Sequence, residues 1–155
     1  MRIKRQKRRR SRASNRAEHL VAALIAGLAL CALALSFEDP RDALIVGLIV
    51  PFWELVATPD VDHNSRKVFR GSLLRRLWAL FWWPYKKLIP HRSAWSHSLL
   101  KGFPLRLLYV VLPLQLLLPY FGAAWIAHFV LAALVADVVH LWLDGYAPKQ
   151  MLLGR

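Results

Sequence analysis

Apolar residues along this chain fall into four long runs, which cover residues 20–37, 43–57, 105–120 and 123–143. An α-helix rises about 1.5 Å per residue, so a run of this kind near 20 residues long can cross the hydrocarbon core of a bilayer. The second run is shorter and contains Pro51 and Glu54, and Pro113 interrupts the third. The pattern predicts an all-α fold, a four-helix integral membrane protein.

The central segment between the second and third runs has a different pattern. Residues 71–88 combine three Trp, one Phe and one Tyr with four basic residues. Ser72 is suited to cap a helix there and Pro84 to stop it. Aromatic and basic residues together also bind single-stranded nucleic acid, but the density of Leu and Trp favours lipid. We therefore expect an interfacial helix in this segment.

Charge is distributed unevenly between the apolar runs. The chain is 57% hydrophobic, yet its formal net charge is +13. Nine of the 22 basic residues lie in residues 2–16, ten lie in residues 66–106 and two follow the fourth run, whereas Arg41 alone lies in the loop 38–42. Basic loops stay on the cytoplasmic side of a membrane. The sequence thus predicts a multi-pass protein of the cell membrane with a cytoplasmic central segment and cytoplasmic N- and C-termini.

The division of the chain follows from the same charges. Residues 2–16 contain no acid, and such a block repels itself, so residues 1–17 are expected to form a basic, disordered cytoplasmic arm. The arm could bind nucleic acid, anchor to lipid headgroups or act as a topology signal. We favour contact with membrane lipids and a topological role, and no small-residue cleavage site suggests a signal peptide. Residues 18–155 are expected to form a single helical domain.

Two short motifs carry candidate metal ligands. Asp60 and Asp62 form a D-x-D motif, and His91 and His97 are six residues apart. Carboxylate oxygens with imidazole nitrogens suit zinc, manganese or iron. Each motif is common and would also fit a solvated polar loop, but together they indicate a site for divalent metal ions. The single Cys31 excludes an intrachain disulfide and a thiolate metal site.

The predicted topology adds four residues to this group. His19 precedes the first run, and Asp137, His140 and Asp144 near the end of the fourth are spaced three and four apart, on one helix face. Ionisable residues near a bilayer are costly and usually face a cavity or a partner. Four separate segments are therefore expected to deliver His and Asp side chains to the cytoplasmic end. The alternative is that these residues merely mark helix ends.

Three further polar residues lie near these candidates in sequence but are not included in the predicted ligand set. His128 points away from the ligand face of the fourth run, so we expect it to make a helix-packing hydrogen bond. Glu54 could support the site or pair with Arg106 or Arg92. His63 directly follows the D-x-D motif, and we leave it outside the ligand set.

The motifs also carry a resemblance to a known family. The segments T-P-D-V-D (58–62), R-L-W-A-L-F-W-W-P-Y (76–85), H-R-S-A-W-S-H (91–97) and A-D-V-V-H-L-W-L-D (136–144) resemble an uncharacterised family of metal-binding proteins. That family is similar, more distantly, to predicted membrane-bound metal-dependent hydrolases, which are grouped with zinc-dependent phospholipase C and zinc nucleases. The resemblance implies one pool of metal ligands: His19, Asp60, Asp62, His91, His97, Asp137, His140 and Asp144.

The functional hypothesis is a metal-dependent hydrolase that acts on a phosphoester, with a lipid as one candidate substrate, at the cytoplasmic membrane face. Asp60 or Asp62 would serve as a general base or bridging ligand, and Arg92 could hold a phosphate through two hydrogen bonds. Zinc is the expected ion, with manganese or iron as alternatives. The competing hypothesis is a non-catalytic metal-binding scaffold or sensor, because a closed metal site is structural. Nucleic acid is not expected as a partner.

Overall fold

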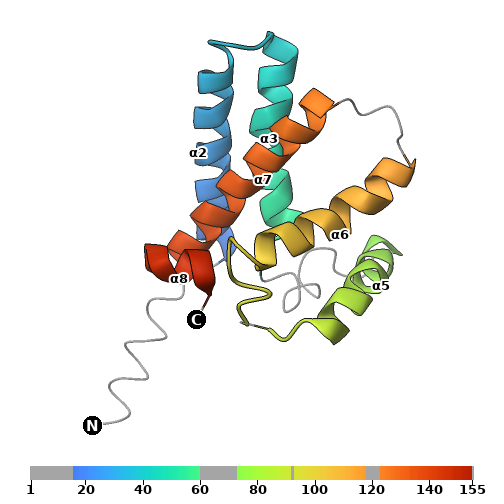
Figure 1. Ribbon diagram of the computed structural model, residues 1–155. Helices are drawn as coiled ribbons and strands as arrows, with labels where there is room; N and C mark the ends of the chain where they lie inside the picture. The colour runs from blue at the N-terminus through green and yellow to red at the C-terminus, as the bar shows by residue number, and fades with distance from the viewer. Residues whose placement is uncertain (1–15, 60–72, 92, 118–122, 155) are drawn as a thin grey trace.

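The computed structural model describes residues 16–59, 73–91, 93–117 and 123–154. Within these residues the chain forms helices and no strand (Figure 1). The helices are α2 (Arg16–Ala34), α3 (Pro40–Val56), α5 (Leu73–Leu88), α6 (Gly102–Leu117), α7 (Ala123–Leu143) and α8 (Pro148–Leu153). The predicted all-α class is confirmed, and the four apolar runs correspond to α2, α3, α6 and α7.

The turn between α2 and α3 is defined by local capping. The Asp39 carboxylate accepts hydrogen bonds from the backbone N–H groups of Arg41 at 2.8 Å and Asp42 at 3.1 Å. Pro40 occupies the first turn, where its missing N–H costs no hydrogen bond. The N–H groups of Asp42 and then Arg41 hold the pKa of the Asp39 carboxyl below its ordinary value of 3.8. These interactions start α3 at Pro40, before the apolar run begins at residue 43.

Two glycines allow α2 and α3 to approach closely. The two helices stand side by side, and α7 crosses against them (Figure 1). A Cβ atom added to Gly47 would lie 2.7 Å from Cys31 Cβ and 2.8 Å from the carbonyl oxygen of Gly27. A Cβ at Gly27 would likewise overlap the Gly47 carbonyl oxygen. Small residues at a helix contact let two backbones come together, as is common between membrane helices.

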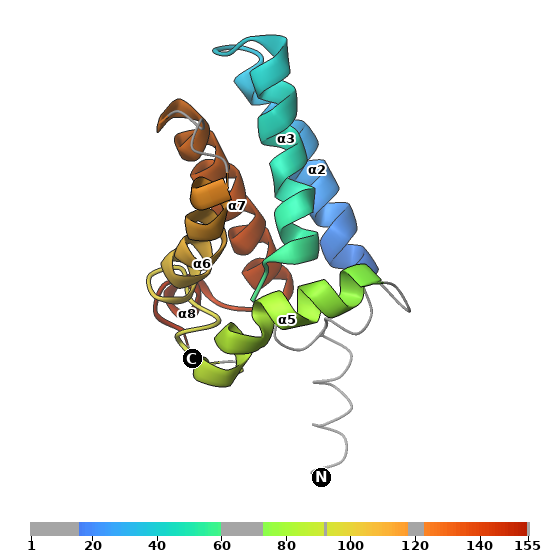
Figure 2. The same ribbon diagram turned by 90° about the vertical axis from the view of Figure 1, so that its right-hand side faces the viewer.

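Helix α5 lies crosswise to α2 and α3 at one end of the bundle (Figure 2). The prediction that Pro84 stops this helix is wrong, because α5 continues through Pro84 to Leu88. Trp82 and Tyr85 on either side of the proline are buried, and their rings lie 5.1 and 5.6 Å from the ring of Tyr109 in α6. This aromatic packing offsets the backbone hydrogen bond lost at the proline, which costs about 3 kcal/mol or more. Ser72, the expected cap, lies outside the described residues.

In the part of the chain that the structure describes, two helices are long and apolar enough to cross a membrane. They are α2, over Ala17–Ala34, and α7, over Trp125–Leu143, whereas the apolar helix Gly102–Leu116 in α6 is shorter. Helix α3 has 17 residues and contains Pro51. Only 17% of the segment Ala17–Ala34 is buried within the chain. Cores of soluble proteins and signal sequences contain helices of this kind as well. The helices therefore weakly indicate membrane association, and four crossings stay a prediction.

Candidate metal centre

Three helix ends meet at one end of the bundle, and four ionisable side chains of the described residues gather there. His19 lies near the start of α2, Glu54 near the end of α3 and His140 near the end of α7, with Asp144 just beyond it. The antiparallel α2–α3 pair and α7 bring these ends together (Figure 1). Two of the three ends are helix C-termini, whose carbonyl groups carry a partial negative charge that favours a cation.

The four side chains form a compact cluster. His140 Nδ1 lies 3.1 Å from Glu54 Oε1, and His19 Nδ1 lies 3.9 Å from the same oxygen. On the other side, His19 Nε2 lies 3.4 Å from Asp144 Oδ1 and His140 Nε2 lies 3.7 Å from Asp144 Oδ2. The two imidazole rings are tilted against each other with centroids 4.4 Å apart. Each carboxylate therefore contacts both histidines, Glu54 through Nδ1 and Asp144 through Nε2.

Burial differs within the cluster. His19, Glu54 and His140 are buried, whereas the Asp144 side chain is 23% exposed. Because three members are shielded from water and one is not, the cluster has a protected interior and one side open to the surroundings. Such an arrangement can hold an ion while leaving a path to it.

The donor atoms fit a divalent metal ion. One ligand atom from each of His19, His140 and Asp144 can be chosen so that all three lie within 4.8 Å of one another. Ligand atoms about 2.0–2.2 Å from a tetrahedral zinc ion would lie roughly 3.3–3.6 Å apart, close to the two contacts of Asp144. With neutral imidazoles the cluster carries two negative charges, which a divalent cation would neutralise. Among the described residues, buried Glu54 Oε2 and His19 Nδ1 make no hydrogen bond.

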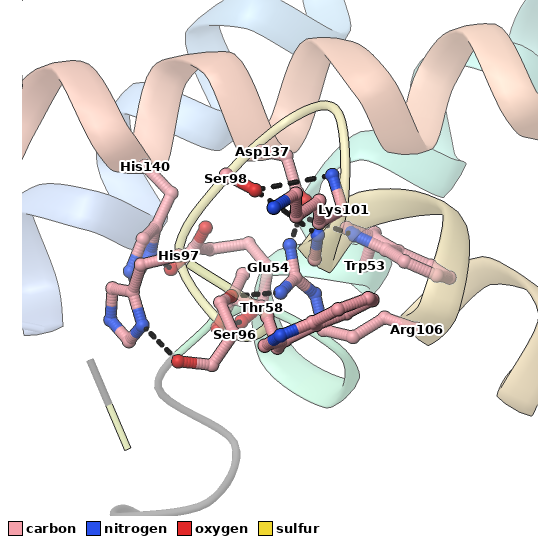
Figure 3. A network of polar contacts seen from close by, with 12 residues as sticks. Trp53, Glu54, Thr58, Ser96, His97, Ser98, Lys101, Arg106, Asp137 and His140 are labelled. Carbon is pink, nitrogen blue, oxygen red and sulfur yellow. Dashed lines mark hydrogen bonds and ion pairs between the residues drawn. The ribbon is translucent and has the colours of Figure 1, made fainter. Parts of the chain in front are cut away.

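The predicted ligands His91 and His97 lie in the loop before α6. His97 is buried, and its Nδ1 atom lies 2.8 Å from Ser96 Oγ (Figure 3). The exposed His91 ring lies 5.3 Å from the His97 ring. His97 also stacks on Tyr146 with ring centroids 6.0 Å apart. The structure therefore pairs the two histidines with each other, and neither belongs to the group of His19, His140 and Asp144.

The C-terminal helix α8 is hydrogen-bonded to the loop that contains His91 and His97, a contact that the sequence did not predict. The backbone N–H groups of Leu99 and Leu100 donate to the carbonyl oxygens of Met151 at 2.7 Å and Leu152 at 3.2 Å. Helix α8 is thus joined to the loop by main-chain hydrogen bonds. A short helix with no apolar periodicity beyond one turn gave no signal of this role in the sequence.

Asp137 has partners other than the histidine cluster. Its Oδ1 accepts a hydrogen bond from Trp53 Nε1 at 2.9 Å, and its Oδ2 is paired with the Arg106 guanidinium (Figure 3). Arg106 also donates to the backbone carbonyl of Ser96, and both members of the ion pair are fully buried. Both carboxylate oxygens are bonded to N–H donors. The expectation of Asp137 as a ligand is therefore not supported, although it shares a helix face with His140.

The structure resolves the alternatives for two other residues. His128 Nε2 lies 3.2 Å from Glu38 Oε1, which links α7 to the loop between α2 and α3 at the end opposite the cluster. The predicted helix-packing role of His128 is confirmed. Glu54 contacts the histidines, whereas Arg106 pairs with Asp137, so Glu54 belongs to the site and is the member that sequence analysis left undecided.

Several predicted site residues lie outside the described part of the chain. They are Asp60, Asp62, His63 and Arg92. Their roles as ligands, general base and phosphate-binding residue stay predictions. The described residue next to Asp60 is Pro59, which is buried and lies five positions after Glu54, and the described neighbours of Arg92 are His91 and Ser93.

A comparison with protein families gives a match that spans most of the chain. A family model described as "Uncharacterized metal-binding protein (DUF2227)" matches residues 10–151. No curated protein and no solved structure matches the sequence. The matched range covers all four members of the cluster and most of the chain. The chain therefore belongs to the uncharacterised metal-binding protein family DUF2227.

Proposed function

We propose that this protein binds a divalent metal ion through His19, His140 and Asp144 and uses it to hydrolyse a phosphoester at the cytoplasmic face of a membrane. The observation that carries the proposal is the convergence of these three side chains, whose chosen ligand atoms lie within 4.8 Å of one another. They come from the start of α2 and the end of α7, so only the folded chain creates the site.

Glu54 has a different role in this proposal. A metal-binding histidine commonly donates its second ring N–H to a carboxylate, which fixes the tautomer and the orientation of the ring. Glu54 Oε1 faces Nδ1 of both histidines, at 3.1 and 3.9 Å. With Nδ1 protonated, the Nε2 lone pairs point to the Asp144 side. Glu54 is therefore a positioning residue, and the Nε2 atoms are the ligands.

The ligand set favours a catalytic site over a closed structural one. Two histidines and one carboxylate are the protein ligands of several zinc hydrolases, in which a further coordination position stays open. The partly exposed Asp144 lies on the open side of the cluster. The ion would supply Lewis-acid chemistry, namely activation of water and polarisation of a phosphoryl oxygen. Zinc fits this set, and manganese or iron are alternatives.

The remaining roles in this proposal fall to residues outside the cluster. In this proposal Asp60 or Asp62 acts as a general base or further ligand, and Arg92 binds the phosphate group. A lipid substrate is supported by the position of the site at the end of two helices, α2 and α7, that are apolar enough to cross a bilayer. Membrane lipids are then both the surroundings and a substrate class.

Metal content and turnover test the proposal together. Wild type, His19→Ala, His140→Ala and Asp144→Ala would be purified in detergent, and bound metal would be measured by mass spectrometry. His128→Ala, on the same helix as His140 but paired with Glu38 at the far end, is the matched control. We expect lost metal and lost hydrolysis of a chromogenic phosphodiester in the three ligand variants only. Equal metal in all five proteins would refute the site.

A second candidate function is a non-catalytic scaffold or sensor. It is supported because the ligands come from both α2 and α7, so an ion would join two helices and stabilise the fold. The two functions differ in one measurement. A scaffold would show a metal-dependent rise in melting temperature without turnover of phosphodiester, phosphomonoester or phospholipid substrates.

The membrane topology has its own test. Single cysteines in a Cys31→Ser background would be labelled from outside intact cells. We expect labelling within residues 38–42 and protection within residues 73–101. The reverse pattern would overturn the cytoplasmic location of the site.

A further inference from the structure

Helix α5 presents three different faces around its axis. Trp82 and Tyr85 are buried against each other, and the rings of Trp78 and Phe81 pack against Trp82 and against one another. Tyr109 of α6 completes the aromatic cluster, since its hydroxyl donates to the Phe81 carbonyl oxygen. One face of α5 is thus bound to the protein through aromatic side chains.

A second face of α5 is apolar and exposed. Leu73, Leu77, Leu80 and Leu88 recur every three or four residues together with Pro84, and all five are exposed. We call these five residues the leucine stripe. Their spacing places them on one side of the helix, away from the aromatic cluster. A contiguous apolar surface of this kind usually marks an interaction site.

A third face of α5 is basic. Arg76 and Lys87 lie beside the leucine stripe, and Lys87 Nζ lies 5.1 Å from the centre of the Trp83 ring. A tryptophan paired with a cation is typical of the headgroup region of a bilayer. Cationic side chains next to an apolar face complement an anionic lipid surface, and no acidic residue occurs between residues 73 and 91.

We infer that α5 lies in the plane of an anionic bilayer with its leucine stripe in the acyl chains, its basic face at the headgroups and its aromatic face against α6. The sequence led us to expect lipid contact from the combined density of Leu and Trp, whereas Trp82 is buried against α6. Here Trp78, Phe81, Trp82 and Tyr85 are the intramolecular anchor. Two observations support a bilayer as the occupant: α5 lies crosswise to α2 and α3 (Figure 2), and these two helices also expose leucines.

The inference rests on the membrane location in the proposed function, but it does not depend on metal binding or hydrolysis. Nitroxide labels would be placed singly at Leu77, Leu80 and Ala79 in a Cys31→Ser background of the full chain. Ala79 is the matched control, because it is exposed but lies off the leucine stripe. Each labelled protein would be reconstituted in vesicles of phosphatidylcholine alone or with phosphatidylglycerol.

Collision rates with oxygen, which enters bilayers, and with a water-soluble nickel chelate give the position of each label. We expect oxygen to dominate at Leu77 and Leu80 and the nickel chelate to dominate at Ala79, with a larger contrast in the anionic vesicles. Nickel access at all three positions would overturn the inference, as would spin–spin coupling between labels of two copies. An equal contrast in both lipid mixtures would overturn the anionic preference.

Metal content of each labelled sample separates this inference from the proposed function. Normal metal with a water-exposed leucine stripe would refute the lipid contact alone. Absent metal in unlabelled wild type, with lipid-embedded labels, would refute the metal site alone.

Discussion

Glu54 offers the sharpest test of how the histidines are held. It faces Nδ1 of His140 at 3.1 Å and of His19 at 3.9 Å, and it lies opposite Asp144 across the two rings. If Glu54 orients the rings and is not itself a ligand, its loss should weaken metal binding without abolishing it. Loss of a residue that orients metal ligands commonly lowers affinity about 10- to 100-fold.

Two substitutions separate charge from geometry. Glu54→Gln keeps an oxygen that can accept a hydrogen bond from His140 Nδ1, so we expect the smaller loss of affinity, about tenfold or ~1.4 kcal/mol. Glu54→Ala removes the hydrogen-bond partner of His140 Nδ1 and the carboxylate that faces His19 Nδ1, and it leaves a buried gap, so we expect about 100-fold or ~2.7 kcal/mol. His140→Ala removes a ligand and should lose more than either.

Zinc affinity would be measured by competition with a chromophoric chelator in detergent. Glu38→Gln is the control, because Glu38 also contacts a histidine, His128, but at the opposite end of the bundle. Unchanged affinity in Glu54→Ala would refute the orienting role. A loss as complete as that of His140→Ala would show that Glu54 is a ligand in its own right.

Three further predictions concern the fold. Gly47→Leu should lower the free energy of unfolding by about 1–3 kcal/mol through overpacking, and Ala29→Leu on the exposed face of α2 should not, as thermal unfolding in detergent would show. Arg106→Met should lower the free energy of unfolding by about 3–5 kcal/mol, because it leaves the buried Asp137 carboxylate without its ion-pair partner. In a double-mutant cycle, the double variant Arg106→Met/Asp137→Leu should recover most of that loss. A double variant no more stable than Arg106→Met would contradict the buried pair. The pKa of Asp39 is lowered in the fold, so its contribution to stability is present above the unfolded pKa and is lost as pH falls through the lower, folded pKa. The difference in unfolding free energy between wild type and Asp39→Asn should therefore shrink on acidification below about pH 4. A difference independent of pH would show that the cap is not charged.

The sequence alone determined the helical class and the positions of the apolar helices. The run at residues 123–143 coincides with α7, because a long apolar segment without Pro or Gly can satisfy its backbone hydrogen bonds within one helix. The start of α3 was missed by three residues because capping by Asp39 overrides the apolar pattern. Helix α5 was placed correctly at its N-terminal side, but its end was misjudged, because packing against Tyr109 decided whether the chain could continue past Pro84.

The sequence also identified three of the four cluster members. His19, His140 and Asp144 are conspicuous because ionisable residues at the ends of apolar helices are few and costly. Asp137 satisfied the same rule and the same helical periodicity as His140, yet it pairs with Arg106 and Trp53. Periodicity describes which residues share a face and contains no information on what that face meets.

Only the tertiary structure decided the role of Glu54 and the partners of each carboxylate. Glu54 and His140 are 86 positions apart in sequence, and Trp53 and Asp137 are 84 apart. The two neighbours on α3 therefore bind two neighbours on α7 that are less than one turn apart. Which carboxylate receives the arginine and which receives the histidines depends on the rotation of α7 against α3 and on the position of α6, which supplies Arg106. Both are set by side-chain packing across the bundle.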